Sequence, residues 1–393
     1  MSPAADTAAA PSDRAYLSPT AVDWAIRRSG MSVATLAARL KVDTLTVESW
    51  RRRDGSHPSF AKARQLATLL RVPFGYLYLK TPPDETLPLP DFRGFKPPYA
   101  PSAELRDLLN SVLLKRDWYR QREQIAGAQP LKFIGSCTPN NRAEDVARLI
   151  RERLEITPAL RASMRNWSEY VSTLSKRAEA AGVLVMRSSV VGNNALRKIR
   201  REELLGFAIS DDLAPLVFVN ASDHKSSQVF TLAHELAHLW IGESALGNPD
   251  ELDEDRHNRV EQFCNQVAAE VLVPQAEFQA AWAADNSPDL ETRVERLARA
   301  FRVSAFVVLR RARETRRLSP DDYVDLKRRE FASRRREQSA GGDYYRNILA
   351  RMGGRLTEAV LSDLSGRQLE YRDGATLLSM KVPALSKFVE KWK

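Results

Sequence analysis

The sequence contains few of the residues that build cross-linked scaffolds. Only two of its 393 residues are cysteines, Cys137 and Cys264, which is too few for a disulfide framework. They do not form a CxxC pair, so a structural zinc ribbon is excluded. No apolar run reaches the roughly 20 residues that a membrane-spanning helix needs, and the first residues lack the charged segment and apolar core of a signal peptide. We therefore expect a cytoplasmic protein without a membrane partner.

The chain also lacks the composition of a disordered protein. Hydrophobic residues make up 43% of it and charged residues 28%, as in ordinary globular proteins. The length predicts two or three domains. The 60 lysines and arginines exceed the 50 aspartates and glutamates, which gives a formal net charge of +10. This excess favours polyanionic partners but does not specify a fold.

Short helical patterns dominate residues 18–80. Gly30, Gly55 and Pro73 mark the ends of three of the four predicted helices. The segment SVATLAARLKVDTLTVESW has the spacing of a helix-turn-helix: an Ala-rich helix, a tight turn and a second helix. Together with LATLLRVPFGYL, it resembles the Cro/CI-type (XRE) family of lambda-repressor-like domains. The resemblance implies DNA as a partner, and pairing into a homodimer is usual for such DNA readers.

The predicted DNA contacts lie on and after the second helix of this motif. Exposed side chains would face the bases, and arginines would favour the phosphates. The base-facing residues are Thr44, Leu45, Glu48 and Ser49, and the phosphate-facing residues are Arg51, Arg52 and Arg53. The chain departs from the family here, because many members have Glu at position 51 and Gly at position 53. The alternative is a module of the same fold that binds protein or only stabilises the chain.

The apolar pattern changes after a Pro-rich linker and connecting helix, which we expect at residues 81–130. GVLVMRSS, LLGFAISDD and APLVFVNA predict a small sheet of short strands between helices. QVFTLAHELAHLWIG and RVEQFCNQVAAEVLVP resume a helical period, and Pro274 ends the second of them. The sequence therefore predicts a mainly α protein with a small β-sheet, an α+β fold.

The segment HELAH places two histidines four residues apart in the first of these helices. His234 and His238 therefore lie on one helix face and can reach one ion. Glu235 lies one step round the helix, where it can act as a general base. The alternative interpretation is a chance HExxH with two core histidines.

A catalytic zinc usually has three protein ligands, so one more residue is needed. The metzincin extension is excluded, because Ile241 and Ser244 stand where it requires Gly and His. Spacing alone narrowly favours Glu261, at the start of the second helix. The competing candidates are an acidic segment with its histidine and a later glutamate: Asp250, Glu251, Asp253, Glu254, Asp255, His257 and Glu270.

HELAH followed by VEQFCNQVAAEVLVP resembles the ImmA/IrrE family of bacterial metallopeptidases. The second helix of that family reads roughly E-x-x-(A/C)-N-x-(F/V)-A-A-x-L-L-(M/V)-P, and the matching residues are Glu261, Cys264, Asn265, Ala268, Ala269, Leu272 and Pro274. The resemblance covers about residues 182–274. It implies a zincin-like core, a Zn2+ cofactor and Glu261 as the third ligand. Relatives of this core cleave a repressor, or induce its cleavage, after a stress signal.

By this resemblance, we expect a DNA-binding regulatory zinc metallopeptidase that hydrolyses a peptide bond in a protein partner, such as a repressor or a toxin–antitoxin partner. The alternative is a transcriptional regulator or antitoxin whose zincin domain is sensing or structural. The predicted organisation is a disordered tail (1–17), a helix-turn-helix domain (18–80), a linker and connecting helix (81–130), a metallopeptidase domain (131–285), a helix-turn-helix-like module (286–320) and a basic helical C-terminal region (321–393).

Overall fold

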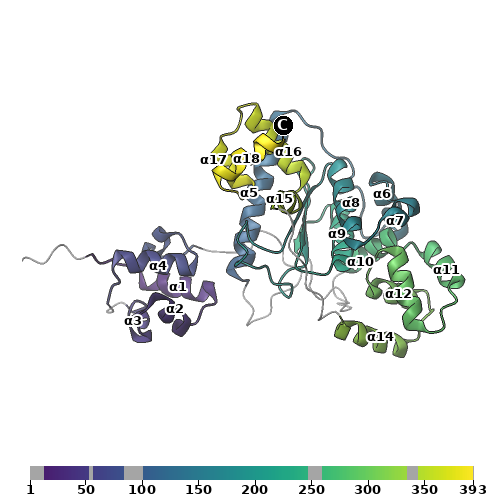
Figure 1. Ribbon diagram of the computed structural model, residues 1–393, viewed down its shortest axis with the longest axis horizontal. Coiled ribbons are helices and arrows are strands. Elements are labelled where there is room, and N and C mark those ends of the chain that lie inside the picture. Colours follow the sequence, from purple (N-terminus) through teal and green to yellow (C-terminus); the bar gives the residue numbers. More distant parts are fainter. Residues whose placement is uncertain (1–12, 53–55, 84–100, 247–258, 334–343, 393) are drawn as a thin grey trace, which may run out of the picture. The chain divides into compact units, whose positions relative to one another are not determined.

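The computed structural model shows a mainly helical chain with one small sheet (Figure 1), which confirms the predicted α+β class. It describes residues 13–52, 56–83, 101–246, 259–333 and 344–392. The chain divides into two compact units: Met1–Leu87 with Pro97–Asp107, and Pro88–Lys96 with Leu108–Lys393. In the described parts of the chain, no helix combines the length and apolar character needed to cross a membrane.

The first unit is a bundle of short helices. In chain order these are α1 (Pro19–Ser29), α2 (Val33–Leu40), α3 (Thr44–Ser49), α4 (Phe60–Leu70) and the 3-10 helix η1 (Phe74–Tyr78). Ser32 and Asp43 accept backbone N–H groups at the starts of α2 and α3, and Gly30 ends α1 in the left-handed conformation. Ala15 and Leu17, which we expected in a disordered tail, are buried in this core. The folded unit therefore extends beyond the predicted boundary at residue 18.

The second unit contains a four-stranded sheet in the order β1-β3-β2-β4. The strands are β1 (Leu184–Ser188), β2 (Gly206–Ile209), β3 (Leu216–Asn220) and β4 (Ala245–Leu246). β1 is parallel to β3, whereas β2 is antiparallel to β3 and to β4. The first three strands coincide with the predicted segments. β4 has two residues and is too short to show an alternating pattern.

Helices cover and extend this sheet. In chain order they are α5 (Ala103–Ile125), α6 (Ala143–Arg153), α7 (Pro158–Ser163), α8 (Trp167–Ala180), α9 (Lys225–Ile241), α10 (Arg259–Leu272), α11 (Gln275–Ala284), α12 (Leu290–Phe301), α13 (Ala305–Glu314), α14 (Pro320–Ser333), α15 (Tyr344–Met352), α16 (Gly354–Ser365), α17 (Tyr371–Leu377) and α18 (Val382–Trp392). α9 is the central one, because it contacts α6, α8, α10 and both β2 and β3. All its residues from Gln228 to Ile241 are buried, as its largely apolar sequence requires.

The segment 286–320 shares its core with the central helices. It forms α12 and α13, and their buried Leu297 and Val308 belong to the same hydrophobic cluster as Leu236 on α9 and Val267 on α10. The repeated helical rhythm predicted a separate module here. The structure differs because the apolar faces of these two helices pack onto the central core rather than only onto each other.

The C-terminal helices pack against the edge of the sheet. α15 and α16 contact β1, and α16 also contacts α8. Gly353, between α15 and α16, has a φ of +81°, and a β-carbon there would lie 2.5 Å from the carbonyl oxygen of Val185 on β1. A glycine is therefore required for this approach.

Candidate metal centre

Two histidines of α9 and one glutamate of α10 converge on one point. Nε2 of His234 lies 3.1 Å from Oε2 of Glu261, and Nε2 of His238 lies 3.3 Å from its Oε1. The two Nε2 atoms are 3.1 Å apart. Because α9 and α10 pack against each other, the i, i+4 pair of histidines faces the first turn of the second helix. The structure thus brings together the three residues predicted as metal ligands.

The spacing of the two imidazole nitrogens and the two carboxylate oxygens fits a tetrahedral metal ion. Ligands held about 2.0–2.1 Å from a zinc ion lie about 3.3 Å from one another. The two Nε2 atoms are 3.1 Å apart, and each lies 3.1 or 3.3 Å from one oxygen of Glu261. Within the described residues, no second group of three or more His, Cys, Asp or Glu side chains converges in this way. The group can therefore hold a metal ion through three side chains, which leaves one tetrahedral position for water or substrate.

Burial and charge act in opposite directions on the Glu261 carboxyl. Burial raises its pKa, but hydrogen bonds with His234 and His238 outweigh burial and hold the pKa well below its usual value. Burial lowers the pKa of His238, although the hydrogen bond to Glu261 opposes that shift. An ionised carboxylate beside a neutral imidazole is thus favoured, and these are the protonation states of metal ligands.

Asn265 supports the site, a role that we did not predict from the sequence. It lies on α10 one turn after Glu261, and its Oδ1 is 3.0 Å from Nδ1 of His234. When Nδ1–H donates to this oxygen, the lone pair of Nε2 points to the metal position. The four-residue spacing from Glu261 is the signal that could have indicated this role.

Glu235 is fully buried on α9, beside strand β2. A β-carbon at Gly206, the first residue of β2, would lie 3.0 Å from Oε1 of Glu235 and 2.9 Å from the carbonyl oxygen of Phe218. It would lie closer still to Cγ2 of Thr231, at 2.6 Å, so the missing side chain at Gly206 makes room for Thr231 as well as for the Glu235 carboxylate. Gly206 was not predicted either, because no local pattern distinguishes it from other glycines that begin a strand.

The competing ligand Glu270 lies in a different environment. Its Oε2 is 2.8 Å from Nη2 of Arg311, and its Oε1 accepts the backbone N–H of Gln275 at 3.1 Å. Cys264 is fully buried, and burial raises the pKa of its thiol, so it behaves as a small core residue. The other candidates lie outside the described residues: Asp250, Glu251, Asp253, Glu254, Asp255 and His257.

The predicted base-facing residues gather on α3 of the first unit. Leu45 is 76% exposed, and Thr44 is also exposed. Ser49 is half-buried, and its Oγ donates to the carbonyl oxygen of Thr46 at 2.7 Å. A single exposed leucine is ordinary on a protein surface, and here it leaves an apolar side chain open to contact with a partner.

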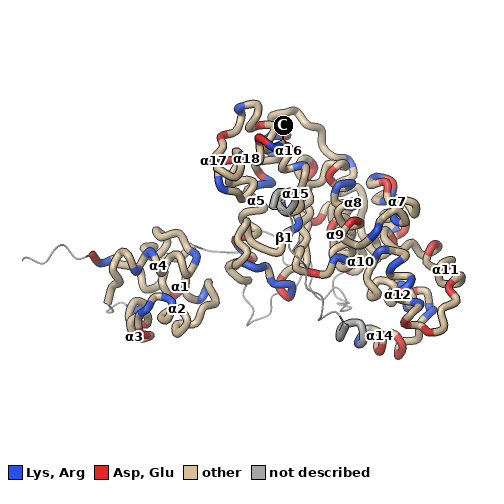
Figure 2. The backbone as a smooth tube through the Cα atoms, viewed as in Figure 1, with Lys and Arg blue, Asp and Glu red and all other residues tan. Residues whose placement is uncertain are grey.

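Not all of the arginines that follow α3 are available to bind phosphate, because one of them already forms ion pairs. Arg51 is paired with Asp23 and with Glu48, whose Oε1 lies 3.0 Å from Nη1 of Arg51. Charges of both signs therefore meet at this end of the unit (Figure 2). Arg52 is exposed, and Arg53 lies outside the described residues. The structure thus places one predicted phosphate contact in an internal ion-pair network.

Residues 178–313 match the model of a peptidase family described as the IrrE N-terminal-like domain. No curated protein matches the chain. The matched segment starts in α8, ends in α13 and contains all four residues of the HExxH-plus-Glu group. The match supports the resemblance to the ImmA/IrrE family for this part of the chain, and with it a role of the metallopeptidase type.

Proposed function

We propose that this protein is a regulatory zinc metallopeptidase that hydrolyses a peptide bond in a specific protein partner, such as a transcriptional repressor or a toxin–antitoxin partner. The observation that carries the proposal is the convergence of His234, His238 and Glu261 within 3.3 Å of one another, with Glu235 on the same helix as the histidines. Zinc is the proposed ion because two imidazoles and one carboxylate are a common ligand set for catalytic zinc.

In this mechanism the side chains of α9 and α10 orient the reacting groups and move one proton. A bound zinc ion would supply a Lewis acid that polarises the scissile carbonyl. Glu235 accepts a proton from the attacking water and then delivers it to the nitrogen of the leaving amine. Asn265 holds the His234 ring in the orientation that this geometry requires.

The test is cleavage of co-expressed repressors and toxins from neighbouring genes, with zinc content measured in the same preparations. Wild-type protein should cleave one of them, and Glu235→Gln should bind equal zinc and leave the substrate intact. Glu295→Gln, an exposed glutamate of α12, is the matched control and should retain cleavage. Cleavage by Glu235→Gln at the wild-type rate would refute the role of Glu235, and zinc-free wild-type protein would refute the ligand set.

A second candidate function is a transcriptional regulator or antitoxin in which the metal group is sensing or structural. The burial of the site favours this alternative, since His234, Glu235 and His238 are all 0% exposed. Zinc-loaded wild-type protein that cleaves no partner but still binds the partner or DNA would support it. A cleavage product that depends on Glu235 would eliminate it.

We also propose that the first unit binds DNA through α3, as a homodimer. The exposure of Leu45 and Thr44 on α3 supports this surface, because both are free to contact base edges. Leu45→Asp should abolish binding to the promoter DNA of the protein's own gene in a gel-shift assay. Val382→Asp, at an exposed apolar residue of α18, should bind as the wild type does. Equal binding by Leu45→Asp would refute this surface.

A further inference from the structure

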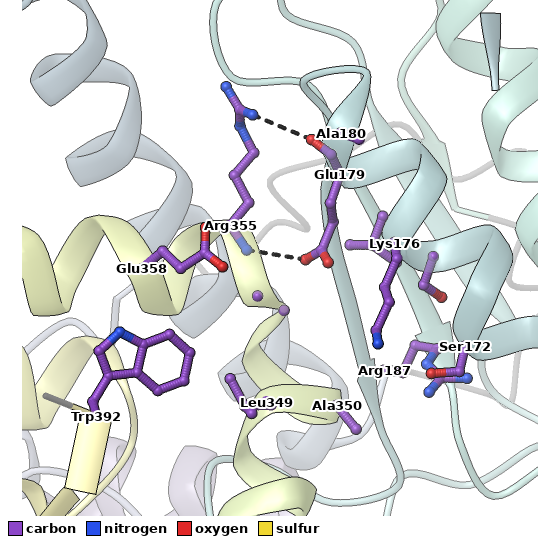
Figure 3. A pocket seen from close by; sticks show the side chains of 14 residues that line it. Ser172, Lys176, Glu179, Ala180, Arg187, Leu349, Ala350, Arg355, Glu358 and Trp392 are labelled. Atoms are coloured by element: carbon purple, nitrogen blue, oxygen red, sulfur yellow. Dashed lines mark hydrogen bonds between the residues drawn. The ribbon is translucent and has the colours of Figure 1, made fainter. Parts of the chain in front are cut away.

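A cavity of about 800 Å³ lies in the second unit, between the sheet edge and the C-terminal helices. Residues of α8, β1, α15, α16 and α18 line it (Figure 3). None of the proposed metal ligands is among these lining residues, and neither is Glu235. The cavity is therefore separate from the metal centre, and its volume falls in the range of roughly 300–1,000 Å³ that small-molecule sites occupy.

One side of the cavity is cationic. Arg187 extends from β1 and Lys176 from α8. The Arg187 guanidinium is attracted electrostatically by the Glu179 carboxyl group. Nη1 of Arg187 is buried and has no hydrogen-bond partner within the described chain. A buried donor without an acceptor costs about 1–3 kcal/mol. An acceptor that enters the cavity would remove this cost.

The Glu179 carboxylate, which also lines the cavity, already accepts a hydrogen bond from the backbone. Oε1 of Glu179 accepts the backbone N–H of Arg355 at 3.2 Å, at the start of α16, and the Arg355 guanidinium donates to the Glu179 carbonyl oxygen. In Figure 3 the donor of both bonds, Arg355, lies on the side of Glu179 opposite to the ends of Lys176 and Arg187. Burial also raises the pKa of Glu179 to about 7, so this carboxyl is only partly ionised at neutral pH. The lining therefore carries the three cations Lys176, Arg187 and Arg355 against the two carboxyl groups of Glu179 and Glu358, which leaves a net positive charge.

The rest of the lining is mixed: Glu358 of α16 adds an exposed carboxylate, and three residues offer apolar and aromatic surface. Leu349 and Ala350 come from α15, and Trp392 comes from α18. Figure 3 shows Trp392 across the cavity from Lys176 and Arg187. The Trp392 side chain is 43% exposed, so a face of its indole ring is available to a planar group.

We propose that this cavity binds a small organic anion. Its carboxylate or phosphate group contacts Arg187 and Lys176, and its apolar or aromatic part packs on Trp392. A guanidinium beside an ammonium suits either anion, because the first donates two parallel hydrogen bonds and the second adds a point charge. The ligand would sit between β1 and the C-terminal helices and would hold them together. The proposal does not depend on the peptidase activity.

The experiment is calorimetric titration of the full-length protein with three probes that share one ring. Benzoate carries a carboxylate, phenyl phosphate carries a phosphate, and benzamide is the neutral counterpart of benzoate. We expect at least one of the two anions to bind. Benzamide should bind about tenfold more weakly than that anion, or weaker still. The anion that binds more tightly identifies the group that the natural ligand carries.

Three variants assign the contacts. Lys176→Gln and Arg187→Met should each weaken anion binding about tenfold. Lys387→Gln, which removes an exposed lysine of α18 that does not line the cavity, should bind as the wild type does. Since Lys176 is exposed on a helix, its variant tests the proposal even if Arg187→Met fails to fold.

Three results would overturn the proposal. The first is the absence of binding by both anions at millimolar concentration. The second is benzamide binding as tightly as benzoate, which would show a merely apolar cavity. The third is an equal loss of affinity in Lys176→Gln and in the Lys387→Gln control, which would show a general effect of net charge.

Discussion

Two half-buried glutamates of the second unit show how their partners decide the charge of a carboxyl group. Burial raises the pKa of both Glu261, in the metal centre, and Glu179, beside the C-terminal cavity. At Glu261 the hydrogen bonds with two imidazoles outweigh burial, and the pKa falls well below its usual value. At Glu179 the main partners are the backbone N–H groups of Arg355 and Gly354, and the pKa rises to about 7. Two imidazoles thus prepare a carboxylate for a cation, whereas backbone donors fix its position without securing its charge.

The largest effect is expected on zinc affinity when Glu261 is changed, because the comparison predicts that its negative charge is essential for binding the ion. Glu261→Gln keeps the shape of the side chain but replaces an anionic ligand by a neutral amide. Zinc affinity should fall by more than about 100-fold, beyond the loss typical of residues that only support ligands. The measurement is elemental analysis after dialysis against a weak chelator. Full zinc retention by the variant, with Glu295→Gln behaving like the wild type, would contradict the assignment.

A smaller effect is expected at Asn265, which orients an imidazole instead of touching the metal. Asn265→Ala should weaken zinc binding about 10–100-fold, because Nδ1 of His234 loses its acceptor and the ring loses its fixed orientation. Asn265→Asp keeps an acceptor oxygen at the same place and should restore most of the affinity. Competition with a chromogenic chelator measures both variants. Equal affinities for the alanine and aspartate variants would show that the contact has no orienting role.

A third effect is expected at Glu179, where a substitution should change the free energy of unfolding in a way that depends on pH. Its pKa is about 7 in the folded protein against an ordinary 4.5, so the folded state holds the proton more tightly than the unfolded state does. The stability that this group contributes is complete below about pH 4.5 and is lost as the pH rises through 7. Glu179→Gln cannot ionise, so at pH 8 it should be more stable than the wild type by about 3 kcal/mol.

Denaturant unfolding at pH 5 and pH 8 measures this difference. The gain of Glu179→Gln over the wild type should appear at pH 8 and shrink at pH 5. Glu144→Gln, at an exposed glutamate of α6, should show no comparable dependence. A gain that is equal at both pH values would show that shape, and not ionisation, separates Glu179 from its glutamine variant.

Local periodicity was sufficient to predict much of the fold and the central part of the site. The i, i+4 spacing of His234 and His238 is a property of one helix, and three of the four strands have patterns that can be recognised locally. Glu261 was narrowly favoured by spacing and more strongly by the resemblance to a known motif. These features depend on neighbouring residues, so the sequence contains them directly.

The remaining features depend on contacts between distant segments. Glu179 and Arg355 are 176 positions apart, and no local pattern connects them. Gly206 is needed because of Glu235 and Phe218, which lie on other elements. Likewise, the amphipathic pattern of residues 286–320 predicts a helix pair but does not specify the surface on which the pair packs. Tertiary packing decides the contact between Glu179 and Arg355, the need for a glycine at position 206 and the surface on which residues 286–320 pack.

The close contact between Gly353 and Val185 has a consequence for the solubility of the protein. β1 is the last strand on its side of the sheet, and its outer backbone groups would be open to pairing with another chain if nothing covered them. α15 and α16 lie against this strand, and we expect them to block its pairing with another copy of the protein. A chain shortened before residue 344 would retain the metal ligands but expose an aggregation-prone strand edge.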